Sequence, residues 1–385
     1  MIIGLAGKTN TGKSSFFKAA TMIDVEIADR RFVTIKPNVG IAFLIVDCVC
    51  KEFGVSCKPK NGKCENGKRF VPVRLVDVAG LVPGAHTGKG LGSKFLDDLR
   101  QASALIHIVD FSGLTNEEGE PAVGYDPGFD IEWVEKEINL WFADVIGRAM
   151  QKVGKAGSKS DLTQMLAEQL SGLEISKQHV EEALQKASYT DVQKFASVVR
   201  KISKPIIIAA NKIDISSARE NYSELKEKFR DLIIVPTSAD GEIALKKAAE
   251  KKLIEYLPGN DFNIVDRNKM NEQQVKALEK IKKEVIGNFG STGVQTCLSK
   301  AVFELLNYIA VYPVADANKL TDKDGNVLPD VFLVPKGTTV KELAFRVHTE
   351  LGEKFICGID ARTKRRLAAD YQLKNNDVVE IAFAK

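Results

Sequence analysis

The sequence contains no apolar run long enough to cross a lipid bilayer, which argues against a membrane-spanning protein. No signal-peptide pattern precedes the first apolar segment, which begins at Ile2. A large excess of charge of one sign is also missing, because 55 Lys and Arg residues face 51 Asp and Glu residues, for a formal net charge of +4. Bulk charge therefore gives no argument for a nucleic-acid partner, since such binding depends on where charges cluster. We expect a cytoplasmic protein with no membrane partner.

The composition is that of an ordinary soluble globular protein, with 44% hydrophobic and 28% charged residues. The length of 385 residues predicts two or three domains rather than one. Neither property indicates the oligomeric state.

The chain has six cysteines, and four of them, Cys48, Cys50, Cys57 and Cys64, fall in one short stretch. In a cytoplasmic protein such clustering suggests a metal before it suggests a disulfide. Four thiolates could bind Zn²⁺ tetrahedrally and hold together a hairpin that has no core of its own. The stretch lacks the Cys-x-x-Cys pairs of typical zinc sites, so unligated structural thiols, a zinc site and disulfides all remain open.

Residues 7–14, Gly-Lys-Thr-Asn-Thr-Gly-Lys-Ser, match the phosphate-binding loop pattern Gly-x-x-x-x-Gly-Lys-Ser. The apolar run Ile2–Ala6 predicts a strand before the loop and residues 15–20 predict a helix after it, which is the context this motif requires. Lys13 is expected to reach the β- and γ-phosphates and Ser14 to hold Mg²⁺. The alternative is a glycine-rich turn that matches by chance. The predicted nucleotide-binding residues of this loop are Gly7, Lys8, Thr9, Asn10, Thr11, Gly12, Lys13, Ser14 and Ser15.

Two later segments carry the remaining candidates for metal and phosphate contacts. Thr34 lies in a polar stretch without periodicity, and its hydroxyl would complete the Mg²⁺ shell when the γ-phosphate is present, unless it is only a solvated loop threonine. Asp77 ends a predicted strand and would hold Mg²⁺ through water, while the Gly80 N–H would meet the γ-phosphate. The predicted catalytic residues are thus Lys13, Thr34 and Gly80, and the predicted metal ligands are Ser14, Thr34 and Asp77.

The glutamine that orients the attacking water in Ras-type proteins is absent, because Leu81 follows Gly80. Intrinsic hydrolysis is therefore expected to be slow. His86 could approach a water molecule from the same loop, but a solvated loop histidine is the simpler interpretation.

Residues 211–214, Asn-Lys-Ile-Asp, match the base-recognition motif of guanine-nucleotide-binding proteins. The Asp214 carboxylate would accept hydrogen bonds from guanine N1–H and the exocyclic amine, and adenine would leave that carboxylate unpaired. Asn211 would support the base edge and the loop, the Lys212 stem would lie along the ring, and the Ala239 N–H could meet guanine O6. The predicted base-binding residues are Asn211, Lys212, Asp214, Ser238 and Ala239.

The rest of the pattern predicts the domain organisation. A G domain with trailing helices is expected over residues 1–115 and 202–310, and a polar helical insertion, such as an antiparallel pair, over residues 116–201. Short strands and one helix over residues 311–385 predict a separate β-grasp domain. This last part carries a basic patch that could touch a phosphate backbone or simply be solvated, made of Arg362, Lys364, Arg365 and Arg366.

Taken together, these segments resemble the Obg-related GTPases, specifically the archaeal YchF-like branch, over nearly the whole chain. The resemblance rests on residues 7–14, 32–40, 77–96 and 211–214, and on a C-terminal part similar to a TGS domain, a β-grasp module linked with RNA and ribosomes. It implies an α/β fold in which a P-loop NTPase G domain carries a helical insertion and is followed by a small TGS-like β-grasp domain.

Two points of the resemblance bear on chemistry. Several bacterial and eukaryotic YchF-like proteins carry Glu in place of Asp214 and favour ATP, and this chain departs from them. Leu81 resembles the hydrophobic substitution of the Obg-related group, whose members often position water by other means, sometimes with K⁺ near a phosphate-loop Asn. Asn10 occupies the matching place, so K⁺ dependence is a hypothesis.

We therefore expect a slow, Mg²⁺-dependent GTPase that binds GTP and GDP and acts as a molecular switch on ribosomes or ribosome-associated RNA. One rival is an Obg-like ATPase with a regulatory role, which a nucleotide-competition assay would identify. The other is an RNA- or ribosome-binding adaptor whose hydrolysis is incidental, and whose binding would be insensitive to Lys13→Ala.

Overall fold

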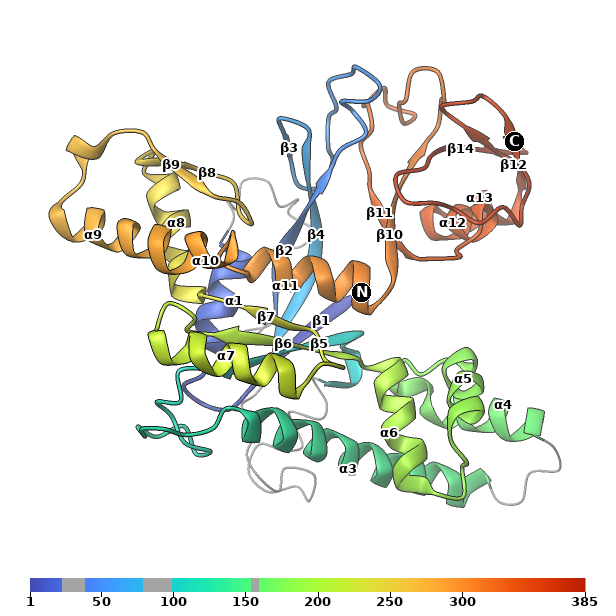
Figure 1. Ribbon diagram of the computed structural model, residues 1–385. Coiled ribbons are helices and arrows are strands. Elements are labelled where there is room, and N and C mark those ends of the chain that lie inside the picture. The colour runs from blue at the N-terminus through green and yellow to red at the C-terminus, as the bar shows by residue number, and fades with distance from the viewer. Residues whose placement is uncertain (23–38, 79–98, 154–158, 385) are drawn as a thin grey trace. The chain divides into compact units, whose positions relative to one another are not determined.

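The computed structural model describes residues 1–22, 39–78, 99–153 and 159–384 (Figure 1). Thr34, Gly80, Leu81 and His86 lie outside the described residues. The described chain forms two compact units. Unit 1 holds residues 1–22, 39–41, 74–78, 99–153 and 159–301, and unit 2 holds residues 42–73 and 302–384. The domain boundaries expected from the sequence remain a prediction.

The first sheet has the strand order β2-β4-β1-β5-β6-β7, with the short strand β3 paired to β4. The pairs β1–β4, β1–β5, β5–β6 and β6–β7 are parallel. The strands are β1 (Ile2–Ala6), β2 (Val39–Asp47), β3 (Cys64–Glu65), β4 (Lys68–Asp77), β5 (Ala104–Asp110), β6 (Ile206–Asn211) and β7 (Ile234–Pro236).

The register of these strands brings the predicted motifs to one edge of the sheet. Leu5 lies opposite Asp77 in the β1–β4 pair, and Asp110 lies opposite Asn211 in the β5–β6 pair. Because parallel strands end at the same edge, the loops that follow them meet there, as ligand-binding loops do in open α/β sheets.

Unit 1 also contains helices that follow or separate these strands, and a two-stranded hairpin of β8 (Ile254–Tyr256) and β9 (Phe262–Ile264). The hairpin interrupts the predicted trailing helices, and its three-residue strands are too short to produce a clear sequence signal. The helices are α1 (Lys13–Thr21), α7 (Ser216–Lys228), α8 (Ala239–Glu250), α9 (Glu272–Lys280), α10 (Gly287–Phe289) and α11 (Val294–Ser299), with 3₁₀ turns at Ser171–Leu173 and Arg267–Lys269 and π-helical turns at Ile281–Ile286 and Lys300–Leu305.

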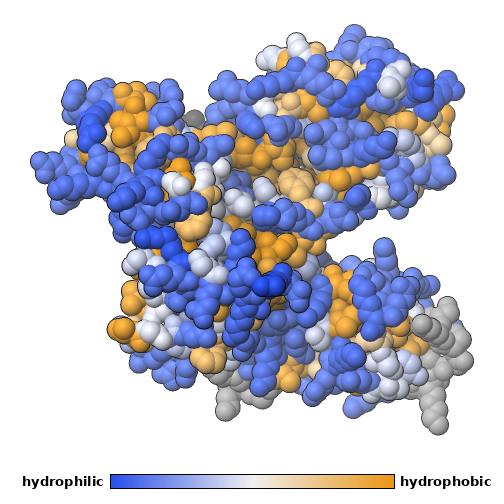
Figure 2. Space-filling view, in the orientation of Figure 1, coloured by the Kyte–Doolittle hydropathy of each residue, from blue (hydrophilic) through white to orange (hydrophobic). Residues whose placement is uncertain are grey.

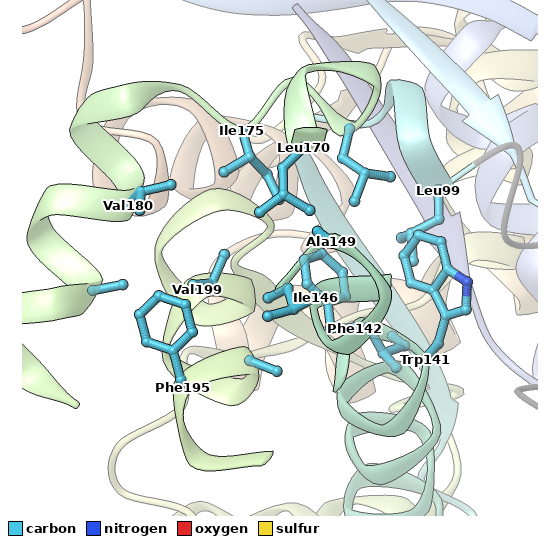
Figure 3. Packing of buried hydrophobic residues seen from close by; sticks show 14 of the residues in the cluster. Leu99, Trp141, Phe142, Ile146, Ala149, Leu170, Ile175, Val180, Phe195 and Val199 are labelled. Carbon is cyan, nitrogen blue, oxygen red and sulfur yellow. The ribbon is translucent and has the colours of Figure 1, made fainter. Parts of the chain in front are cut away.

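The predicted helical insertion consists of α3 (Gly128–Val153), α4 (Lys159–Leu170), α5 (Lys177–Lys186) and α6 (Val192–Ser203), rather than one antiparallel pair. Its helices pack around a hydrophobic core that also includes sheet residues such as Ala6, Val76 and Leu105, and Figure 3 shows part of this core. Trp141 and Phe142 of α3 meet edge to face, with ring centroids 5.1 Å apart. Arg200 of α6 lies almost fully buried against α3, where it contacts Glu135 and donates to Asn139 Oδ1 over 3.0 Å.

The C-terminal part of unit 2 is a β-grasp fold with strand order β11-β10-β14-β12-β13. Thr339 and Glu342 form a capping box that starts the helix packed on this sheet. The sheet begins just before the predicted start of the domain at residue 311. Its elements are β10 (Tyr308–Val314), β11 (Phe332–Pro335), α12 (Val340–Val347), α13 (Thr349–Glu353), β12 (Phe355–Asp360), β13 (Arg366–Leu367) and β14 (Val378–Phe383).

Residues 42–73 complete unit 2, because they pack against the β-grasp part. Arg362 makes a bidentate ion pair with Glu52, with N–O distances of 2.6 and 2.7 Å. Lys364 donates to the Ala317 carbonyl over 2.8 Å. Two side chains of the predicted basic patch are therefore engaged inside the unit, while Arg365 and Arg366 are exposed.

Hydrophilic residues cover much of the face shown in Figure 2, and hydrophobic residues form several groups between them. Among the described helices, none combines the length and the apolar character needed to span a membrane.

Candidate functional site

The loop between β1 and α1 has a backbone that only glycine accommodates at two positions. Gly7 has φ +154°, and a Cβ there would lie 2.5 Å from the carbonyl oxygen of Ile108. Gly12 has φ +89° and precedes α1 with no side-chain cap on the helix N–H groups. Uncapped N–H groups at a helix start attract anions, so the loop has the form of a phosphate cradle.

Lys13 and Asp77 form an ion pair beside this loop, and both side chains are partly accessible. The parallel β1–β4 register explains the contact, because it sets the end of β4 next to the start of the loop. Ser14 is exposed in the first turn of α1 and Ser15 is half-buried. A hydroxyl and a carboxylate are the oxygen ligands that Mg²⁺ prefers, so these residues fit that ion.

Asn211 links the phosphate loop to the segment that follows β7. Its amide nitrogen donates to the Thr11 carbonyl over 2.9 Å. Its amide oxygen accepts from the Ala239 N–H at 3.1 Å and from the Thr237 hydroxyl at 3.5 Å. Asn211 thus holds two predicted nucleotide-binding loops together, although 200 residues separate it from Thr11.

Asp214 lies beside Ser238 with its carboxylate oriented by hydrogen bonding. The Ser238 hydroxyl donates to Asp214 Oδ1 over 3.1 Å and also accepts the Gly241 N–H at the start of α8. Lys280 Nζ lies 3.5 Å from the other carboxylate oxygen, and the Asp214 side chain is 30% exposed. A fixed but accessible carboxylate can accept hydrogen bonds from a base edge.

Lys212 has φ +65° and its ammonium pairs with Asp110 Oδ2 at 2.8 Å. Asp110 is fully buried and also accepts hydrogen bonds from Ser112 and Thr115. Burial alone would raise the pKa of Asp110, but Lys212 and the hydroxyl donors outweigh it and the pKa is lowered. Asp110 was missed as a site residue, although its place at the end of a buried strand could have indicated it.

The side chains of Thr9 and Asn10 form hydrogen bonds with the loop that follows β5. The Thr9 hydroxyl donates to the Glu118 carbonyl over 2.9 Å, and the Asn10 amide donates to the Gly119 carbonyl over 2.9 Å. A Cβ on Gly119, which has φ +83°, would collide with Thr9. Contacts of these two residues with phosphate would therefore come from their backbone N–H groups.

The Lys8 side chain turns away from the loop into the protein. Its ammonium lies 2.6 Å from Asp130 Oδ2, 3.2 Å from the Thr115 carbonyl and 4.3 Å from the centre of the Tyr125 ring. The exposed fractions of the Lys8 and Asp130 side chains are 3% and 5%. This buried ion pair ties the phosphate loop to α3.

Lys8→Met should destabilise the protein by about 3–5 kcal/mol, because it leaves the Asp130 charge buried without a partner. Burial already raises the pKa of Asp130 despite the nearby ammonium, which indicates how costly the charge is there. Urea denaturation of the single variant and of Lys8→Met/Asp130→Asn measures the effect. The double variant should recover most of the loss, since asparagine is neutral and can still accept from the Tyr125 hydroxyl. Equal stability of the two variants would contradict the assignment.

Three protein-family models match the chain. A model described as 50S ribosome-binding GTPase matches residues 2–127, and one described as Obg-like GTPase YGR210-like, G4 motif-containing domain matches residues 209–316. The TGS domain model matches residues 319–382. The first match contains the phosphate loop, and the second contains the predicted base-binding residues.

Relatives match over most of the chain. A GTP-binding protein of Methanocaldococcus jannaschii is 49% identical over 100% of this chain and 99% of its own length. A GTP-binding protein of Schizosaccharomyces pombe is 35% identical over 89% of both. The ribosome-binding ATPase YchF of Bacillus subtilis is 31% identical over 65% of this chain and 69% of its own length.

Solved structures agree with this. A GTP-binding protein from Pyrococcus horikoshii aligns with a TM-score of 0.76 at 40% identity and covers 100% of both chains. The YchF GTPase of S. pombe aligns with a TM-score of 0.59 at 18% identity over 99% of this chain and 97% of its own, which shows the fold alone. The predicted fold, a G domain with a helical region and a C-terminal TGS domain, is confirmed. Both the family models and a full-length relative at 49% identity show that the chain belongs to the Obg-related, YchF-like family of GTPases.

Proposed function

We propose that this chain binds GTP and GDP, hydrolyses GTP slowly with Mg²⁺, and acts as a molecular switch on ribosomes or RNA in the cytoplasm. One observation carries the proposal. The glycine cradle, the Lys13–Asp77 pair and the Asp214–Ser238 pair lie at loops that follow parallel strands of one sheet, and Asn211 connects two of those loops. The family membership supports the same activity.

Lys13 would bind the β- and γ-phosphates, while Ser14 and Asp77 would hold Mg²⁺. Mg²⁺ held there would supply positive charge to stabilise the negative charge that develops during phosphoryl transfer. The contact between the Lys13 ammonium and Asp77 would open as the substrate arrives, because each group has a stronger partner in the complex. Thr34 and Gly80 would complete the metal shell and the γ-phosphate contacts.

Asp214 would read guanine through N1–H and the exocyclic amine, and Ser238 would hold the carboxylate in place. In this arrangement the Asn211 amide holds the loops that form the pocket, in addition to supporting the base. The Ala239 N–H donates to the Asn211 amide oxygen, and guanine O6 would share this donor. The Lys212 stem would lie along the ring, with its ammonium held by Asp110.

Calorimetric titration of GTP, GDP and ATP with Mg²⁺ tests this assignment directly. Micromolar binding of GTP and GDP with much weaker ATP binding would support Asp214 as the base reader. Equal or tighter ATP binding would favour the ATPase alternative, which the name of the B. subtilis relative makes relevant.

Potassium should accelerate hydrolysis. Leu81 stands in the place of the water-orienting glutamine. The Asn10 amide nitrogen donates to the Gly119 carbonyl, which orients the side chain and leaves the amide oxygen to bind a cation. We expect GTP hydrolysis about tenfold faster in K⁺ than in Na⁺ at equal ionic strength, equivalent to about 1.4 kcal/mol of transition-state stabilisation. Single-turnover phosphate release measures the rates, and Asn10→Ala should remove the difference. Equal rates of the unchanged protein in the two salts would contradict the hypothesis.

The ribosome is the proposed partner because one matching family model is described as ribosome-binding and the B. subtilis relative carries that name. Co-sedimentation with ribosomes should increase with a non-hydrolysable GTP analogue relative to GDP. Ribosome binding that changes neither with the bound nucleotide nor with Lys13→Ala would instead support the adaptor alternative.

A further inference from the structure

The four clustered cysteines converge in unit 2. The sulfur atoms of Cys48, Cys50, Cys57 and Cys64 all lie within 4.8 Å of one another. The Cys48 and Cys57 sulfurs are 4.0 Å apart, and the Cys50 and Cys64 sulfurs are 3.8 Å apart. Other groups of three or more His, Cys, Asp or Glu side chains with this closeness are not found in the described part of the chain.

These separations match the edges of a metal–thiolate tetrahedron. Four sulfurs about 2.3 Å from a central Zn²⁺ lie about 3.8 Å from one another. A disulfide would need the two sulfurs of a pair at about 2.0 Å. Each cysteine here is a free thiol, and each of the two short separations is close to the tetrahedral value.

The hairpin fold explains how a spacing without Cys-x-x-Cys pairs reaches this geometry. The Cys48 N–H, just after β2, donates to the Gly67 carbonyl over 2.8 Å. Asn66 and Gly67 have φ of +49° and +74°, which is typical of the tight turn that joins β3 to β4. This turn folds Cys64 back beside the Cys48–Cys50 segment. The closeness of the sulfur atoms therefore comes from tertiary folding and not from the spacing of the cysteines in the sequence.

A buried cation lies next to the cluster. Arg69 is 1% exposed and is the register partner of Cys64 across the β3–β4 pair. One of its terminal nitrogens donates to the carbonyls of Leu328 and Pro329, over 2.7 and 2.9 Å, while the other has no hydrogen-bond partner. Within the described residues it forms no ion pair. The nearby Asp330 carboxylate interacts electrostatically with Arg69 but forms no ion pair with it. Four thiolates around Zn²⁺ carry a net charge of −2, which would add to the negative charge facing this guanidinium.

We propose that Cys48, Cys50, Cys57 and Cys64 bind one Zn²⁺ in a closed, structural site. Soft thiolate ligands in a tetrahedral arrangement favour zinc over magnesium or calcium. Four protein ligands leave no open position for substrate, so the ion has a structural role. The proposal is independent of the nucleotide chemistry of unit 1.

The ion would hold the hairpin against the β-grasp sheet. Cys48 and Cys50 share a buried hydrophobic cluster with Tyr312, Leu328 and Val378 of the C-terminal part. Backbone bonds at the other side of the hairpin reinforce the contact, because the Lys58 and Lys60 N–H groups donate to the carbonyls of residues 327 and 329. Loss of the metal should therefore loosen unit 2 first.

Metal analysis of the full-length protein, purified without chelators, gives the first test. We expect about one zinc per chain, released as four thiols react with a mercurial reagent. Growth in cobalt should give the visible absorption bands of tetrahedral cobalt–thiolate coordination. Three results would each overturn the proposal. They are the absence of zinc, the presence of iron in its place, and cysteines that react as thiols only after a reducing agent has broken disulfides.

A matched pair of variants gives the second test. Cys64→Ser should lose the zinc, and limited proteolysis should then cut within residues 48–67. Cys357→Ser is the control, because Cys357 is also half-buried in unit 2 but lies in β12, outside the cluster. Full zinc content in Cys64→Ser, or equal loss in both variants, would contradict the assignment. The cobalt spectrum of the unchanged protein remains decisive if Cys64→Ser fails to fold.

Discussion

Replacing Asp214 with asparagine is expected to abolish tight GTP binding and to move the preference to xanthosine triphosphate. The carboxylate accepts two donors of guanine, whereas an asparagine amide would place its own N–H group against the exocyclic amine. Xanthine has a carbonyl at that position, which an amide N–H can satisfy. Sites built around such hydrogen bonds reject the wrong partner by up to about 10⁴-fold, so the change in the ratio of GTP to XTP affinity should be large. Calorimetric titration with both nucleotides measures it.

A control separates this effect from a general loss of charge. Asp231 is exposed on the segment before β7, so Asp231→Asn removes the same charge from the same unit without touching the pocket. It should leave the affinities unchanged. Retention of GTP affinity in Asp214→Asn would show that another group reads the base, and a switch to ATP would favour the ATPase alternative.

Lys13→Met should lower the rate of GTP hydrolysis by about 10²–10³-fold, the usual cost of removing one preorganised charge from a developing oxyanion. Relative to the unchanged protein, the variant should lose more affinity for GTP than for GDP, because the lost ammonium contacts the γ-phosphate as well as the β-phosphate. Single-turnover phosphate release and nucleotide titration measure the two effects. The change leaves Asp77 without its ion-pair partner, but both groups are partly solvated and the fold should persist.

Lys18→Met is the matched control for this prediction. Lys18 is exposed on the same helix and carries the same charge, but it lies more than one helical turn farther along α1 than Lys13. Its removal should change the hydrolysis rate less than about twofold, since an exposed charge is screened by solvent. A Lys13 variant that hydrolyses GTP at the rate of the Lys18 variant would refute the proposed role.

Sequence was sufficient for features whose chemistry is local. The phosphate loop depends on glycines at fixed offsets, and Gly7 and Gly12 occupy conformations that demand them. The β-grasp part was predictable from short strands and turns. Asp214 was predicted from the Asn-Lys-x-Asp motif and Ser238 from its place after the next strand, and the structure puts them in contact.

Features that depend on distant pairing were not predictable. No spacing rule connects Asn211 with Thr11, or Lys212 with Asp110, because strand order in the sheet creates both contacts. Lys8 belongs to the loop motif, yet its side chain forms an ion pair with Asp130 in α3, which is distant in the sequence. The convergence of the cysteines likewise depends on the β3–β4 turn, which brings Cys64 beside the Cys48–Cys50 segment.

Unit 2 is built from two chain segments that are far apart in the sequence, and this affects how the protein folds during synthesis. More than two hundred residues separate residue 73 from residue 302. At roughly 5–20 residues per second, the hairpin leaves the ribosome roughly ten to fifty seconds before its packing partner is synthesised. During that interval the apolar residues of the hairpin have no covering surface, but all four clustered cysteines have already emerged. A metal bound at that stage would give the early segment a stable form while the rest of the chain is completed.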